Sequence, residues 1–349
     1  MAYTLNSKIR NLEPYQPILG SYRIRLDANE SFLTPPPELI SRIQDAVASV
    51  PFNRYPDPYA QELCEAFADF YGIDIENVMA GNGSDELISL LFGTFLMKGE
   101  GVMTLSPDFS MYRFYGEISE AKCVEYRKKQ DFTVDVDDLI RTVNSSGVRM
   151  LIFSNPCNPT SLGLKREEIS RLVRSVDSLV VLDEAYMDFW DQSMLSEAES
   201  FDNLIILRTC SKAVGMAAAR LGFAVANRKL IRSLKAVKSP YNVNEVSQRI
   251  GSTVLRQKEW LGSCREKIIG SRNSLFSGIK ALESVKTGKI SVLSPVTNFV
   301  TVRMPQSKLV YQALLKQGIA VRCFEGFLRI TAGSKQENEE FLRAFSAAL

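Results

Sequence analysis

Short apolar runs alternate with amphipathic segments over residues 78–226 of this 349-residue chain. The runs are rich in Val, Ile, Leu, Met and Phe, and we expect strands at 102–105, 122–126, 150–153, 179–182, 204–207 and 221–225. Segments 136–142 and 167–175 between them show helical spacing. Strands that are apolar almost throughout and separated by helices indicate a mostly parallel sheet covered on both faces. Because ligands of such sheets bind at the carboxyl ends of the strands, we predict an α/β fold with a site at that edge.

The pattern changes after residue 240. A long helical stretch over 244–282 precedes three strands, expected at 294–303, 319–322 and 327–331, and a terminal helix. The first forty-odd residues are rich in proline and resemble an arm more than a core element. We therefore predict a large domain at 46–242, a smaller C-terminal α/β domain at 243–349, and an N-terminal arm at 1–45 that also supplies part of the small domain.

Composition excludes several classes of partner. A net charge of +2 gives no reason to expect nucleic acid or an anionic membrane surface. No apolar run approaches the ~20 residues that cross a bilayer, and the first residues do not resemble a signal peptide, so we expect a cytoplasmic protein. The six cysteines are scattered without a CxxC pair, which argues against disulfides and zinc.

The chain contains no histidine. This excludes Ser-His-Asp and Cys-His nucleophiles and histidine metal ligands, and we expect no metal site. Proton transfer must therefore use lysine, a carboxylate, tyrosine or cysteine.

Lys212 has the most informative surroundings of any lysine in the chain. It lies in a segment of small and hydroxyl residues just after the apolar run 204–207, and about thirty residues after a strand end that carries Asp183 and Tyr186. This is the layout of a lysine that forms a Schiff base with pyridoxal 5'-phosphate, with an aspartate that keeps the pyridine nitrogen protonated. We expect Tyr186 to hydrogen-bond the phenolic oxygen of the ring. A lone lysine after a strand is usually a solvated charge, but here several independent segments agree.

A glycine-containing turn before a helix is a candidate phosphate site. Gly83, Ser84 and Asp85 precede a segment with helical spacing of apolar residues. Glycine lets the backbone approach an anion, and the free amides at a helix start bind phosphate. The alternative is an ordinary turn with Ser84 or Asp85 as the helix cap. Hydroxyls and one arginine near the lysine would complete the site: Thr209, Ser211 and Arg220.

Two further loops follow predicted strands. Phe109 follows the first and is a candidate to stack on a planar ring, although an aromatic residue there is often part of the core. Asn158 lies between two Asn-Pro steps, which force an extended, turning backbone that can present one amide to the crevice. We expect its amide to donate to a ring oxygen and Pro159 to be cis, the alternative being a purely structural loop.

Together these residues resemble the fold-type I, pyridoxal-phosphate-dependent aminotransferases. The general match rests on Asn158, Asp183, Tyr186, Lys212, Arg220 and Arg329. More narrowly the chain resembles the histidinol-phosphate aminotransferases, through segments 10–16, 26–30, 54–57, 81–86 and 327–331. These segments span nearly the whole chain in family order.

The resemblance implies a homodimer with shared active sites. Tyr55 of one subunit would reach the cofactor phosphate of the other, and Tyr15 would lie over the neighbouring site. Arg329 would bind the substrate α-carboxylate, while Arg322 and Asn29 would be further substrate contacts.

The sequence departs from the family pattern at three places. Phe109 replaces a common tyrosine, Ser161 replaces the usual glycine, and the segment 323–328 is short.

The activity implied is transamination between L-histidinol phosphate and 2-oxoglutarate, which gives imidazole-acetol phosphate and glutamate, in histidine biosynthesis. Two rivals on the same scaffold stay open: a threonine-phosphate decarboxylase and an aromatic amino acid aminotransferase, because fold and cofactor do not determine which bond breaks. A catalytically silent binding domain is a rival of another class, and the intact Lys212, Asp183 and Arg220 argue against it.

Overall fold

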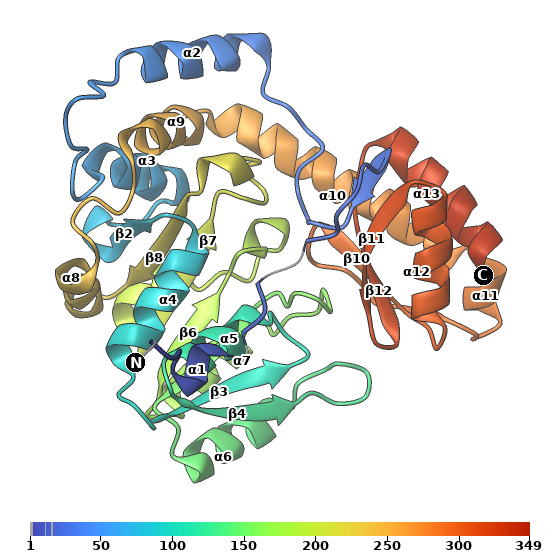
Figure 1. Ribbon diagram of the computed structural model, residues 1–349, viewed down its shortest axis with the longest axis horizontal. Helices are drawn as coiled ribbons and strands as arrows, with labels where there is room; N and C mark the ends of the chain where they lie inside the picture. The colour runs from blue at the N-terminus through green and yellow to red at the C-terminus, as the bar shows by residue number, and fades with distance from the viewer. Residues whose placement is uncertain (1–2, 11, 15–16) are drawn as a thin grey trace.

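The computed structural model describes residues 3–10, 12–14 and 17–349. It has two lobes, and the long helix α10 (Lys258–Lys280) passes from the larger lobe to the smaller one (Figure 1). No helix of the described ranges combines the length and the apolar character needed to cross a membrane.

The larger lobe is built on a seven-stranded sheet with strand order β2-β8-β7-β6-β5-β3-β4. Strands β3 to β7 are parallel to one another, and β8 is antiparallel to both of its neighbours, β2 and β7. The prediction of an α/β fold with a mostly parallel sheet is confirmed. The strand bounds are Val78–Gly81 (β2), Gly101–Ser106 (β3), Lys122–Arg127 (β4), Met150–Ser154 (β5), Leu179–Asp183 (β6), Leu204–Thr209 (β7) and Gly222–Ala226 (β8).

Alternate side chains of this sheet enter two cores, one on each face. Met150 and Ile152 of β5 pack into the core that contains residues of α4 and α5. Leu151 and Phe153 enter the opposite core, with α3, α6 and α7. Burial on both faces explains why these strands are apolar almost throughout. The helix bounds are Gln61–Tyr71 (α3), Ser84–Phe95 (α4), Met111–Ile118 (α5), Val136–Ser146 (α6), Arg166–Arg174 (α7) and Arg228–Val237 (α8).

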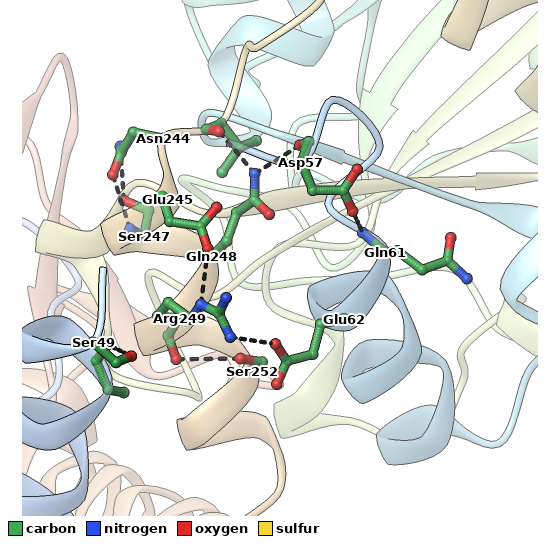
Figure 2. Close-up of polar contacts among 12 residues, drawn as sticks. Ser49, Asp57, Gln61, Glu62, Asn244, Glu245, Ser247, Gln248, Arg249 and Ser252 are labelled. Carbon is green, nitrogen blue, oxygen red and sulfur yellow. Dashed lines mark hydrogen bonds and ion pairs between the residues drawn. The ribbon is translucent and has the colours of Figure 1, made fainter. Parts of the chain in front are cut away.

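Helix α9 (Glu245–Leu255) packs against α3, in the larger lobe. Arg249 of α9 bonds Glu245 on its own helix at 2.8 Å and Glu62 of α3 at 2.9 Å, and Gln248 donates to the Asp57 carbonyl (Figure 2). Leu255 at the end of α9 belongs to the core of this lobe. The predicted domain boundary places these residues in the C-terminal domain instead.

The smaller lobe is built on a five-stranded sheet with order β1-β11-β12-β10-β9. Its bounds are Ile24–Leu26 (β1), Ser291–Val292 (β9), Phe299–Arg303 (β10), Ile319–Phe324 (β11) and Phe327–Thr331 (β12). The N-terminal strand β1 is parallel to β11, so the chain start completes a sheet made by the chain end. The remaining helices are Ser7–Arg10 (α1), Pro37–Ala48 (α2), Glu283–Lys286 (α11), Ser307–Lys316 (α12) and Lys335–Ala348 (α13).

Candidate active site

The candidate residues lie where parallel strands end. Asp183 is the last residue of β6 and Thr209 the last of β7, with Lys212 three residues further on. The loop after β5 carries Asn158. Because β5, β6 and β7 are neighbours and parallel, their carboxyl ends share one edge of the sheet. These candidate residues therefore lie at the edge of the sheet where the strand pattern predicted a site.

Asp183 is a buried carboxyl held by two donors. The hydroxyl of Tyr112 donates to Oδ2 at 2.7 Å, and the amide of Ala185 donates to Oδ1 at 3.0 Å. Burial raises the pKa of Asp183 to about 6, although both donors oppose the shift. A cation placed opposite this carboxyl would favour its ionised form. The geometry suits a partner that carries positive charge on a ring nitrogen.

Sequence reasoning did not single out Tyr112. Burial and the charge of Asp183 raise the pKa of Tyr112 well above its usual range, so its hydroxyl stays a donor. The signal was available, because Tyr112 lies three residues after Phe109, near the start of α5. The Phe109 ring meets Tyr112 edge-on at 5.5 Å between centroids and is half-buried.

Asn29 connects the two lobes at Tyr186. Its side-chain amide donates to the Tyr186 hydroxyl at 2.8 Å, and its backbone amide donates to the Thr331 hydroxyl at 3.0 Å. Thr331 in turn donates to the Asn29 side-chain oxygen at 3.0 Å. Asn29 adopts a left-handed conformation with φ 55°, which asparagine tolerates better than most residues. Its position thus fixes Tyr186 of the large lobe relative to β12 of the small lobe.

Asn158 is oriented by an arginine from the smaller lobe. Arg329 donates from Nη1 to the Asn158 side-chain oxygen at 2.5 Å. With the oxygen engaged, the NH₂ group of Asn158 is the part left to act as a donor toward a ligand. The Asn158–Pro159 bond is cis, as predicted, and so is Asn155–Pro156.

Gly83, Ser211 and Arg220 form an anion cradle at the start of α4. Gly83 has φ +83°, a conformation that favours glycine, and a Cβ there would lie 2.7 Å from the Arg220 guanidinium and force it to shift. Arg220 donates from Nη1 to the Ser211 hydroxyl at 3.5 Å, and Thr209 donates to the same hydroxyl at 3.0 Å. Asp85 in the first turn of α4 lies 3.5 Å from Arg220. Amides of a helix start, two hydroxyls and a guanidinium together suit a phosphate.

Lys212 places its amine beside Tyr186. Nζ donates to the Ala28 carbonyl at 3.1 Å and lies 5.9 Å from the centre of the Tyr186 ring. A half-buried primary amine on the loop after β7, beside Tyr186, is a candidate to react with a carbonyl group.

The smaller lobe contributes two arginines on neighbouring strands. Arg322 of β11 and Arg329 of β12 are directly opposite in the antiparallel register. Like charges placed opposite each other are destabilising, and a bound anion would offset their repulsion. Arg329 is buried, bonds the Asp27 carbonyl at 2.5 Å and lies over the rings of Phe299 and Phe324. The segment 323–328 is short because it is a tight hairpin between β11 and β12.

Two predicted residues are not joined to this cluster. Tyr55 is 81% exposed and stacks on Tyr241 at 4.6 Å. No hydrogen bond or ring contact among the described residues connects it to another predicted site residue. Tyr15 lies outside the described residues.

The donor set of this chain fits pyridoxal 5'-phosphate. Asp183 would face the ring nitrogen, the tightly packed cradle at Gly83 and Arg220 would take the phosphate, and Lys212 has the amine that this cofactor requires. Fold and donor set together point to the class of pyridoxal-phosphate enzymes.

Comparison with known proteins gives the family. Residues 19–345 match the family described as aminotransferase class I and II. The chain is 40% identical over 339 residues to a histidinol-phosphate aminotransferase of Clostridium novyi (strain NT), covering 96% of this chain and 94% of that one. It is 39% identical over 346 residues to a protein of the same name from Clostridium kluyveri (strain NBRC 12016), covering 98% and 97%.

A solved structure agrees with this fold. The crystal structure of histidinol-phosphate aminotransferase from Sinorhizobium meliloti in complex with pyridoxal-5'-phosphate matches with a TM-score of 0.88 at 21% identity, covering 99% of this chain and 98% of that one. The chain therefore belongs to the aminotransferase class I and II family, and the family prediction is confirmed.

Proposed function

We propose that this protein transfers the amino group between L-histidinol phosphate and 2-oxoglutarate, with pyridoxal 5'-phosphate as cofactor, in histidine biosynthesis. The observation that carries the proposal is the meeting of Asp183, Lys212 and Arg220 at one edge of the sheet, in a chain 40% identical to a histidinol-phosphate aminotransferase.

The cofactor, when bound, supplies an electron sink for the electron pair left at the substrate Cα. The chain supplies the rest. Lys212 moves the proton between the substrate Cα and the cofactor C4′, as base and then as acid. Asp183 holds the proton on the ring nitrogen, and Tyr112 keeps that carboxyl in place. Asn158 and Tyr186 donate to the phenolic oxygen, since their other hydrogen bonds leave a donor for it.

The two arginines serve the anionic ends of both substrates. Arg329 binds the carboxylate of glutamate or 2-oxoglutarate, because a planar guanidinium matches a carboxylate with two parallel hydrogen bonds. Arg322, directly opposite on β11, meets the phosphate of histidinol phosphate. Asn29 borders the same space through its bond to Tyr186.

The active unit in this proposal is a homodimer. Exposed aromatic side chains gather in one part of the sequence, at Phe52, Tyr55 and Tyr59, and Tyr55 stacks on the exposed Tyr241. Such a surface suits a partner subunit, whose cofactor phosphate Tyr55 would reach. Mixing two inactive variants, Tyr55→Ala and Lys212→Ala, would restore part of the activity through hybrid dimers with one intact site. A fully active monomer in sedimentation would refute the shared site.

We also place the protein in the cytoplasm. Its six cysteines are free, which suits a reducing compartment.

A panel of amino donors tested with 2-oxoglutarate decides the substrate. Histidinol phosphate should be used best. Efficient use of phenylalanine or tyrosine without histidinol phosphate would favour the aromatic aminotransferase instead, and release of CO₂ from threonine phosphate would favour the decarboxylase. Absence of cofactor binding would refute the whole proposal.

A further inference from the structure

A buried lysine and a buried aspartate lie behind the residues proposed to touch the cofactor ring. Lys128 directly follows β4, and Asp108 lies in the loop after β3. Their side chains are 3% and 2% exposed, and Nζ lies 4.0 Å from the carboxylate. Neither residue belongs to the site described above, and charged groups so deeply buried need a reason to be there.

Lys128 joins two loops that follow neighbouring strands. Nζ donates to the Pro107 carbonyl at 2.8 Å, in the loop after β3, and to Cys157 Sγ at 2.9 Å, in the loop after β5. Burial lowers the pKa of Lys128, but Cys157 and Asp108 raise it by more, which favours the ammonium. Burial also raises the pKa of Asp108, and the charge of Lys128 opposes that shift. One side chain thus holds the residues that flank Phe109 on one loop and Asn158 on the other.

Asp108 completes the connection through hydrogen bonds. Its carboxylate accepts from the amide of Phe109 at 2.8 Å, from the amide of Ser154 at 3.2 Å and from the Ser154 hydroxyl. The Ser154 hydroxyl oxygen accepts from the amide of Asn158 at 3.1 Å. An unbroken path therefore runs from Phe109 through Asp108 and Ser154 to Asn158, and Lys128 neutralises its one charge.

We propose that Lys128 and Asp108 are a positioning pair that fixes Phe109 and Asn158 relative to the cofactor ring. The inference rests on the proposed function, because it assigns those two residues to the ring. Neither member of the pair touches the cofactor. Their role is to hold a stacking ring and an amide donor at the distance and angle that the ring requires, since small displacements of such groups are costly.

The test uses apo protein titrated with pyridoxal 5'-phosphate. Lys128→Met keeps the length of the side chain and removes its charge and donors. We expect its cofactor Kd to rise roughly tenfold, a fraction of the ~100-fold that a 1 Å misplacement can cost. The pH midpoint of the visible absorption of the bound cofactor should also move upward, because a phenolic oxygen that loses the Asn158 donor holds a proton more tightly.

Asn203 offers a matched control. Its side-chain amide bonds the carbonyls of Val173, Val176 and Ser178, at the amino-terminal side of the sheet. Asn203→Ala should lower Tm while it leaves both cofactor readouts unchanged. If Lys128→Met behaves in the same way, the pair is only structural and the inference is overturned.

A second variant keeps the test decisive should Lys128→Met fail to fold. Lys128→Met with Asp108→Asn leaves no unpaired buried charge. The double variant should fold, and it should show the same rise in cofactor Kd and the same shift in the pH midpoint of visible absorption. Wild-type values of both quantities would overturn the inference. Wild-type protein that takes up no cofactor would overturn the proposed function as well, so the two failures are distinguishable.

Discussion

The proposed cofactor end and the proposed substrate end of the candidate site are assembled in different ways. At the cofactor end, Ser211 bonds Thr209 two residues away and Arg220 nine residues away, within one loop of the large lobe. At the substrate end, Asn29 bonds Thr331 across 302 residues of sequence, and Arg329 bonds Asn158 across 171. The cofactor end is formed by residues of one lobe. The substrate end is formed by residues of both lobes and of the N-terminal segment.

Substitutions at the two ends should therefore have different consequences. Changes at the cofactor end should alter cofactor binding and the chemical step for every substrate. Changes at the substrate end should leave the cofactor bound and alter which substrate is used. Variants at single residues can contradict this division or refine it.

Lys212→Ala should cause the greatest loss. Without the amine, no group is placed to move the Cα proton, and turnover should fall by at least about 10⁴-fold for all donors. Borohydride reduction and peptide mapping of the wild type should find the cofactor on Lys212, and the variant should lack the covalent chromophore near ~420 nm. Lys229→Ala, at an exposed position on α8, is the control with wild-type activity. Attachment to another lysine would contradict the assignment.

Asp183→Asn should cause the next greatest loss of turnover. An amide cannot hold a full proton on the ring nitrogen, so turnover should fall by roughly 10³-fold, about 4 kcal/mol of barrier. The loss should be equal for glutamate and for histidinol phosphate, since this residue serves the cofactor end. A variant with near-normal turnover would remove Asp183 from the mechanism.

Asp183 should also shape the pH dependence of stability in the apo protein. Its folded pKa, about 6, is above the ordinary 3.8, so the folded state favours the protonated form. The resulting stability is fully present below pH 4 and is lost as pH rises through 6, by about 3 kcal/mol. Urea unfolding at pH 4.5 and pH 7 should show about 2 kcal/mol of this loss, because the unfolded carboxyl is already mostly ionised at pH 4.5, and in Asp183→Asn the difference should disappear. Equal pH dependence in both proteins would contradict it.

The sequence predicted where the strands end better than which distant segments of the chain come into contact, for physical reasons. An apolar run in the sequence ends where its strand ends. The strand pattern alone was therefore enough to place Asp183 and Lys212 at the carboxyl edge of the sheet. The strand at 327–331 was found at its observed bounds. The pairing of β1 with β11 and the bond from Asn29 to Tyr186 could not be found, because no local pattern encodes contacts across hundreds of residues. Lys128 was missed because a buried lysine looks like a solvated one in sequence.

Arg329→Lys separates the two ends most directly. A lysine keeps the charge and can still donate one hydrogen bond to the Asn158 oxygen, but it loses the paired bonds to a carboxylate. We expect kcat/KM for glutamate to fall by roughly 100-fold, about 2.7 kcal/mol, with cofactor Kd within a few-fold of wild type. Steady-state kinetics and cofactor titration measure the two quantities. A loss of cofactor that matches the loss of activity would show that the ends are not separable here.

Arg322→Ala should affect the two amino donors differently. It should lower kcat/KM for histidinol phosphate by roughly tenfold to 100-fold, because one charge-assisted contact with the phosphate is lost. The kcat/KM for glutamate should not change. Competing both donors in one assay gives the ratio directly. Equal losses for both would remove Arg322 from phosphate recognition.

Ser161, which links the two ends, should give the mildest change. It is buried with φ 64°, and its hydroxyl pairs with Thr297 at 2.6 Å and accepts from the Val296 amide at 3.2 Å, both in the small-lobe chain. Ser161→Gly relieves about 1 kcal/mol of backbone strain and loses hydrogen bonds of similar worth, so unfolding free energy should change by less than ~1 kcal/mol. Ser161→Ala keeps the strain and loses the bonds, and should cost about 1–3 kcal/mol.

Because the bonds lost in both variants join the lobes, each should raise KM for glutamate slightly and leave cofactor Kd unchanged. Urea unfolding and steady-state kinetics on the two variants give both quantities. If the alanine and glycine variants are equally stable, backbone strain at Ser161 is negligible. If cofactor Kd moves instead of KM, the contact serves the cofactor end, and the division between the two ends fails at the residue where they meet.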